Sequence, residues 1–305
     1  MCSSDLLARG YIRNDSELVT RVEDKTPIKN VVERYELIKT ALCPRHIGYT
    51  TVEQASIYKA LRDDPLTEDE QIILDIIKRH MPINKKKIIE DSPISESATA
   101  DALSSLIHRS EIYLDRSSAY HIVPDCGLEK DEATAAVIRN HFEDFGIFSA
   151  ERLALFTGFR MGIIRRVLAD LEDEGLLVKG YLREDSSTLY WMLAADYGKK
   201  VDKVRDLMVL NTQDNLHVYL RDRIKDQCGA TEAAVFRGSD VVASFRGKIT
   251  ASGAKVEEFK GPMDILRFVK MTASKYGVSL RKDSDRESDE WDSMEFYLKS
   301  NPGVM

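Results

Sequence analysis

Two stretches of this chain repeat each other, and the repeat constrains the fold more than any other feature. Residues 83–114 align with residues 148–179 without a gap, at a constant offset of 65. Each copy follows a first helical pattern with a short second helix, which begins at a polar capping residue, Asn84 or Ser149. A turn, a longer third helix and an alternating hairpin complete the copy. This order of elements predicts a winged helix, twice.

The third helix of each copy carries an apolar stripe that predicts its buried face. Helical spacing places these residues on one side: Leu103, Leu106 and Ile107 in the first copy, and Ile164, Val167, Leu168 and Leu171 in the second. In the second copy we expect Gly158 and Gly175 to end the second and third helices, because glycine adopts positive φ angles at little cost.

These patterns divide the chain into five segments. Residues 65–124 and 125–195 are the two predicted winged helices, and residues 196–305 read as strand, amphipathic helix, three strands and another helix. Ahead of them we place a truncated wing at residues 1–24 and a helical connector at residues 25–64. The predicted fold class is α+β: tandem winged-helix (helix-turn-helix) domains, then a mixed α/β domain with a small antiparallel sheet.

The helical connector is predicted from one apolar face. At helical spacing that face holds five residues: Val31, Val32, Tyr35, Ile38 and Leu42. A second connector helix is expected after Thr50, and Asp63-Asp64-Pro65 then breaks the chain before the next domain.

The N-terminal residues look like the end of a further winged helix. Residues 6–15 match residues 176–185, the predicted wing of the second copy, with Gly10, Tyr11 and Asp15 among the identities. We therefore expect a fragment, with the body of a third winged helix upstream and residues 1–5 a sequencing artefact. The alternative is a genuine short N-terminus whose hairpin only resembles a wing.

Charge and cysteine usage limit the possible classes of protein. The net charge is −7, so any nucleic-acid surface must be local. No apolar run is long enough to span a membrane, and no signal-peptide pattern is present. The four cysteines lie far apart without CxxC spacing, so neither a zinc site nor a disulfide framework is indicated. We expect a cytoplasmic protein that contacts no membrane.

No motif in the chain predicts catalysis. There is no GxxxxGK[ST] phosphate loop, no GxGxxG after a strand and no HExxH. The DEAT sequence at residues 131–134 opens an amphipathic helix, whereas a catalytic acidic box must follow a buried strand. We therefore expect no catalytic residue, no metal and no cofactor in this chain.

Cationic residues of the second copy predict a DNA-binding surface. A recognition helix and its wing place arginine and lysine against phosphates, and here the candidates are Arg160, Arg165, Arg166, Lys179 and Arg183. The corresponding third helix of the first copy has Ser95 and Asp101 in place of Arg160 and Arg166, and its lysines at 85–87 lie on the second helix. The alternative is that these arginines are only solvated, since winged helices also bind proteins.

The order of these elements also resembles a known family. The runs FTGFRMGIIRRVLADLEDEGLLVKGYLREDSSTLYWM, VLNTQDNLHVYLRDRI and AAVFRGSDVVASFRG resemble the C-terminal region of the large helicase-related (Lhr) superfamily 2 DNA helicases. Tandem winged-helix DNA glycosylases share that arrangement. The resemblance covers roughly residues 125–305, and it implies the accessory tail of an ATP-driven translocase. The helicase motor motifs are absent, and no glutamine pair matches the glycosylase motif.

Three functions follow, from different classes. The first is a non-catalytic accessory region of an ATP-dependent helicase, which would bind single-stranded, forked or duplex DNA beside upstream motor domains. The second is a DNA-repair glycosylase domain, which needs a pocket for a damaged base. The third is a stand-alone winged-helix transcriptional regulator that binds duplex DNA as a dimer.

Overall fold

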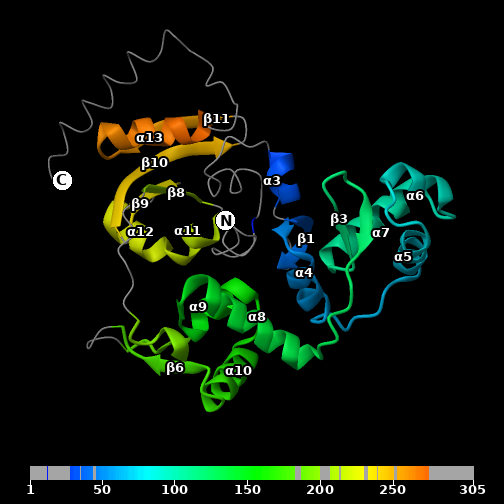
Figure 1. The fold of residues 1–305 in the computed structure, drawn as a ribbon, viewed down its shortest axis with the longest axis horizontal. Coiled ribbons are helices and arrows are strands. Elements are labelled where there is room, and N and C mark those ends of the chain that lie inside the picture. Colours follow the sequence, from blue (N-terminus) through cyan, green and yellow to red (C-terminus); the bar gives the residue numbers. More distant parts are fainter. Residues whose placement is uncertain are drawn as a thin grey trace, which may run out of the picture. The chain divides into compact units, whose positions relative to one another are not determined.

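The structure is a computed structural model, which describes residues 12, 28–34, 36–43, 46–182, 187–199, 207–212, 214–229, 233–238, 240–250 and 253–274. These residues belong to two compact units: the first takes in residues 32–200, and the second takes in residues 12–31 together with those after residue 200. We describe each unit separately (Figure 1). The predicted wing at residues 1–24 lies outside the described residues, apart from the buried Ile12.

The first unit contains two successive sets of three helices and a hairpin. The first three-helix unit runs through α5 (Glu68–His80), α6 (Lys85–Asp91), α7 (Glu96–His108), β3 (Ile112–Leu114) and β4 (Tyr120–Ile122). The second three-helix unit runs through α8 (Lys130–Phe145), β5 (Ile147–Phe148), α9 (Ala150–Thr157), α10 (Met161–Asp173), β6 (Leu177–Gly180) and β7 (Tyr190–Leu193), with a short 3-10 turn, η1 (Ala194–Asp196), behind it.

The offset of 65 residues is visible in the element boundaries. The helices α7 and α10 begin and end 65 residues apart, and α6 and α9 begin at the same offset. Asn84 and Ser149 both cap their helices, since their side chains accept hydrogen bonds from the backbone N–H three residues later. Ile83 forms an isolated bridge with Tyr120, at the position where β5 pairs with β7. The repeat and the two predicted helix starts are confirmed.

Apolar stripes on the third helices form the two cores. Leu103 and Leu106 of α7 pack with Ile73, Ile77 and further residues of α5 and the hairpin. The predicted stripe of α10 is likewise buried throughout, from Ile164 to Leu171.

Glycines end the helices of the second three-helix unit as expected. Gly158 closes α9 in the left-handed conformation with φ 71°, and Gly175 follows the C-cap of α10 with φ 73°. The N–H of Gly175 donates to Glu172 O and that of Leu176 to Leu171 O, so two carbonyls at the end of α10 find donors.

The connector differs from its prediction. A helix, α3 (Ile28–Arg34), is followed by a hairpin of β1 (Ile38–Cys43) and β2 (His46–Thr50), and only then by α4 (Val52–Lys59). The predicted helical face through Ile38 and Leu42 is therefore wrong, while a helix does begin after Thr50 as expected.

Pairing with the first three-helix unit explains why the connector forms strands. The strand β1 lies next to β3, so the sheet order is β2-β1-β3-β4. Thr40 is fully buried in this sheet, where its hydroxyl donates to Ile112 O at 3.0 Å. This contact lies 72 residues away along the chain, so local spacing could not reveal it.

The second unit is a four-stranded antiparallel sheet with helices. Its elements are β8 (Leu207–Asn211), α11 (Asn215–Tyr219), α12 (Arg221–Cys228), β9 (Ala233–Arg237), β10 (Asp240–Thr250), β11 (Gly253–Lys260) and α13 (Met263–Ser274). The strand order is β11-β10-β9-β8. Val235 belongs to the core formed with α13, whereas its neighbours Ala234 and Phe236 pack with Ile224 of α12. Alternating residues therefore bury both faces of the sheet.

The fold is thus mixed α+β with small antiparallel sheets. Among the described residues, no helix combines the length and the apolar character that crossing a membrane requires.

Candidate nucleic-acid interface

The helix α10 presents a largely polar face because its large buried apolar residues lie on the opposite side. Ile164, Val167 and Leu168 are buried against the core, while Arg165 and Arg166 between them are exposed. Arg160 occupies the N-cap position, and its carbonyl accepts the first backbone hydrogen bonds of the helix. The sequence thus places all three arginines on or before one short helix.

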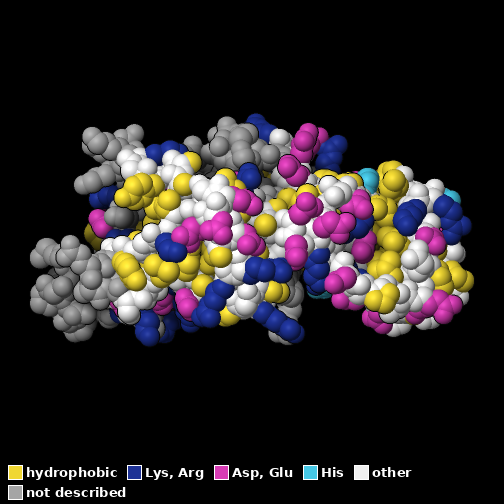
Figure 2. All heavy atoms as spheres, turned by 90° about the horizontal axis from the view of Figure 1, so that it is seen from below, with side chains coloured by type: hydrophobic (Ala, Val, Ile, Leu, Met, Phe, Trp, Pro, Cys, Tyr) yellow, Lys and Arg dark blue, Asp and Glu magenta, His cyan; other side chains and the backbone are white. Residues whose placement is uncertain are grey.

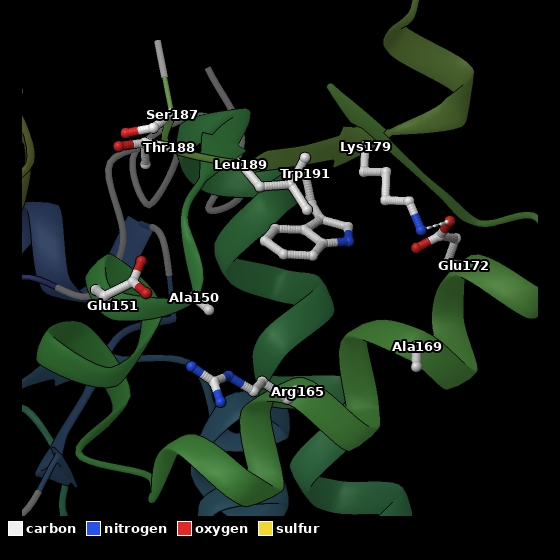
Figure 3. A pocket seen from close by; sticks show the side chains of 10 residues that line it. All are labelled: Ala150, Glu151, Arg165, Ala169, Glu172, Lys179, Ser187, Thr188, Leu189 and Trp191. Carbon is white, nitrogen blue, oxygen red and sulfur yellow. Dashed lines mark ion pairs between the residues drawn. The ribbon is translucent and has the colours of Figure 1, made fainter. Parts of the chain in front are cut away.

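A pocket of about 520 Å³ opens between this polar face and the following hairpin (Figure 3). Arg165, Ala169 and Glu172 line it from α10, at helical spacings of four and three residues. Lys179 of β6 and Trp191 of β7 line it from the hairpin, where they are cross-strand partners.

The rest of the pocket is small or polar. Ala150 and Glu151 approach from the start of α9, and Ser187, Thr188 and Leu189 precede β7. Two cations and two carboxylates therefore line a space that also has an aromatic wall and two hydroxyl groups.

The structure brings two of the five predicted DNA-binding residues to this pocket. Arg165 and Lys179 both line it, and Figure 3 shows Lys179 directed at Glu172 while Arg165 points away from that pair, toward the side on which Glu151 lies. The Lys179 Nζ forms an ion pair with Glu172 Oε1 at 2.7 Å. No ion pair of Arg165 occurs among the described residues, so its guanidinium is available to a ligand.

Arg166 has a different environment from its neighbour. Its guanidinium forms an ion pair at 2.8 Å with Asp131 in the first turn of α8, and both side chains are largely exposed. Arg160 is exposed but does not line the pocket. Arg183 lies outside the described residues. The five cations thus do not all line one pocket.

Acidic residues partly neutralise the lysine run of the first three-helix unit. Lys86 forms an ion pair with Glu90, and Lys87 with Asp91 at 2.7 Å. The hydrogen bond from Lys87 to Asp91 raises the pKa of that lysine. On the molecular face in Figure 2, cationic and acidic side chains are likewise interspersed.

Sequence reasoning missed Trp191 and the two glutamates of the pocket. The register of the hairpin pairs Trp191 with Lys179, but that register is fixed by strand pairing across a long turn. The indole Nε1 of Trp191 is buried and donates to no acceptor within the described part of the chain. In that same part, no group of three His, Cys, Asp or Glu residues could hold a metal ion.

The structure is similar to a solved structure, that of the Streptomyces sahachiroi DNA glycosylase AlkZ. The superposition has a TM-score of 0.62 and covers 91% of each chain, at 14% sequence identity. The two chains share a fold. This agrees with a winged-helix-like arrangement, as the resemblance to tandem winged-helix glycosylases implied. No family model matches the sequence, and a search of the curated proteins finds no match.

Proposed function

We propose that this chain is a DNA-binding protein of DNA repair, built on two winged helices, α5–β4 and α8–β7. The observation that carries the proposal is the similarity of fold to a DNA glycosylase over nearly the whole of both chains. The surface at α10 and the β6–β7 hairpin supports it, because a third helix and its wing are the elements that a winged helix places on DNA.

Arg160 and Arg165 are our first candidates for phosphate contacts. Both are exposed, and neither forms an ion pair within the described residues. Lys179 would have to leave Glu172 to bind a phosphate, and Arg166 would have to leave Asp131. We therefore expect these two cations to contribute less to DNA affinity than unpaired cations would. Arg183 stays a candidate on its sequence position alone.

Base excision is the specific activity we propose to test. The similarity to AlkZ supports it better than it supports a helicase accessory role. In this reaction the C1′–N bond to the base breaks, and water adds to C1′ of the deoxyribose and gives up one proton to a carboxylate or to solvent. An N-alkylated base, which is cationic in the nucleotide, leaves as a neutral molecule. A carboxylate that orients the water is needed, and Glu151 is the pocket carboxylate without an ion pair among the described residues.

The experiment has two parts. Fluorescence anisotropy on forked and duplex oligonucleotides across a salt series should show binding that weakens with salt, by counterion release. Oligonucleotides that contain alkylated bases should then yield alkali-labile abasic sites. Binding without abasic sites would contradict base excision and leave DNA binding standing. Absence of binding to every oligonucleotide would overturn the proposal as a whole.

A further inference from the structure

We propose that the pocket between α10 and the β6–β7 hairpin takes up one unpaired nucleobase of the bound DNA, stacked on Trp191. The inference rests on the proposed function, because DNA supplies the base. It adds a single-base site to a surface that would otherwise only contact phosphates.

Size is the first argument. A volume of about 520 Å³ falls within the range of roughly 300–1,000 Å³ that is typical of small-molecule sites. Ala150 and Ala169 leave this space open, since each ends at its Cβ atom. Larger side chains at these two positions would fill the pocket from α9 and α10.

Charge argues for a base rather than a phosphate. Lys179 and Glu172 already neutralise each other at 2.7 Å. The two other charged residues of the lining, Arg165 and Glu151, carry opposite charges, so the formal charges of the pocket sum to zero. A phosphate inside the pocket would meet two carboxylates, whereas a neutral base carries both donors and acceptors. Glutamate accepts hydrogen bonds from exocyclic amines, and Arg165 can at the same time contact the phosphate of the bound nucleotide.

Trp191 supplies the stacking surface. Aromatic side chains bind bases by stacking, whatever the sequence. The indole ring of Trp191 forms one wall of the pocket. A planar base that enters the pocket can therefore stack on it.

The fluorescence of Trp191 gives a direct test. The chain has two tryptophans, so a Trp291→Phe background leaves Trp191 as the only tryptophan, whose emission is excited selectively at wavelengths that tyrosine does not absorb. The probes are a 20-base-pair duplex, the same duplex with one bulged adenine, and the same duplex with an abasic bulge. We expect the adenine bulge to quench Trp191 and to bind about tenfold more tightly than the abasic bulge, the scale of one stacked base.

Three variants test the pocket without relying on loss of the fold. Ala169→Met fills the pocket at an exposed helix position and should abolish the preference for the adenine bulge over the abasic bulge. Trp191→Ala should do the same, provided that its circular dichroism matches wild type. Glu151→Ala should reduce the preference for bulged adenine over bulged thymine, because thymine has no exocyclic amine.

The outcomes distinguish this proposal from the proposed function. Equal binding of all three duplexes, without quenching, overturns the base pocket while DNA binding stands. If no oligonucleotide binds, a titration with deoxyadenosine monophosphate decides. Saturable quenching that Ala169→Met removes supports the pocket without DNA binding, and a flat titration overturns the pocket as well.

Discussion

Arg165 and Arg166 are adjacent in sequence but differ in their partners. Arg165 lines the pocket without an acidic partner among the described residues, while Arg166 is held by Asp131 at 2.8 Å. A phosphate can therefore recruit Arg165 directly, but it must displace a carboxylate to recruit Arg166.

The first prediction tests Arg165→Ala, with Arg166→Ala as the matched control. Arg165→Ala should weaken duplex binding by roughly tenfold, the scale of one charge-assisted hydrogen bond, and should lower the log–log salt slope by about one. Arg166→Ala should have a smaller effect. Anisotropy across a salt series measures both. A larger loss with Arg166→Ala would show that we have assigned the contact to the wrong arginine.

The second prediction concerns pH and Asp115 in the β3–β4 turn. Its Oδ1 accepts from Ser117 N, Ser117 Oγ and Ala119 N at 2.7–2.9 Å, and its Oδ2 lies 3.0 Å from His121 Nε2. Partial burial alone would raise the pKa of Asp115, but these hydrogen bonds outweigh it and lower the pKa from 3.8 to about 2.

A lowered pKa in the folded state means that ionised Asp115 stabilises the fold above pH about 4. This contribution should be lost as the pH falls through about 2. Wild type should therefore be more stable than Asp115→Asn at pH 6, and the difference should shrink between pH 4 and pH 2. Urea unfolding across this range measures it, and a difference independent of pH would contradict the assignment.

The third prediction compares substitutions at two glycines, Gly162 inside α10 and Gly175 just after it. Gly175 has φ 73°, so Gly175→Val should cost about 1 kcal/mol or more, because a β-branched residue is strained there. Gly162 lies inside α10, with nothing within 4 Å of an added Cβ, so Gly162→Ala should stabilise by about 0.5–1 kcal/mol. Melting temperatures should shift in opposite directions. A shared sign would contradict the backbone assignment.

At the scale of elements, the sequence predicted the helices whose positions depend on the local spacing of apolar residues and on capping residues. Helices α6, α7, α9 and α10 follow from apolar stripes and from caps such as Asn84 and Ser149. The β1–β2 hairpin was missed because its strands depend on pairing with β3, some 70 residues away. The pocket was missed for a similar reason, since strand register alone sets Trp191 opposite Lys179.

The fourth prediction concerns a bulge between β10 and β11. The register shifts at Gly247, which has φ 140°, and an added Cβ would lie 1.9 Å from Lys255 O. Gly247→Ala should therefore destabilise the second unit by roughly 1–3 kcal/mol. Gly180 in β6 is the control, because an added Cβ meets nothing within 4 Å. Equal unfolding midpoints for the two variants would exclude this close approach.

At the scale of the whole molecule, acidic residues outnumber basic ones, with a net charge of −7. The DNA binding that we propose would then depend on a few local cations rather than on a general attraction. The sequence also lacks a phosphate-binding loop.

The fifth prediction follows from that composition. The purified 305-residue chain should not hydrolyse ATP, with or without DNA. A coupled phosphate-release assay measures this, with a heat-denatured sample as the blank. Turnover that DNA stimulates in a homogeneous preparation would overturn our interpretation of the motifs.

The two hairpins of the repeated units differ in whether the edges of their first strands are already paired with other strands of the protein. In the first three-helix unit, β3 lies between β1 and β4, so both of its edges are occupied. In the second, β6 is an edge strand among the described residues and pairs with β7 alone. A change at the open edge of β6 therefore disturbs no further strand, whereas a change in β3 affects its pairing with both neighbours. Laboratory evolution of new binding preferences should accordingly accept changes in residues 179–182 more readily than in residues 112–115.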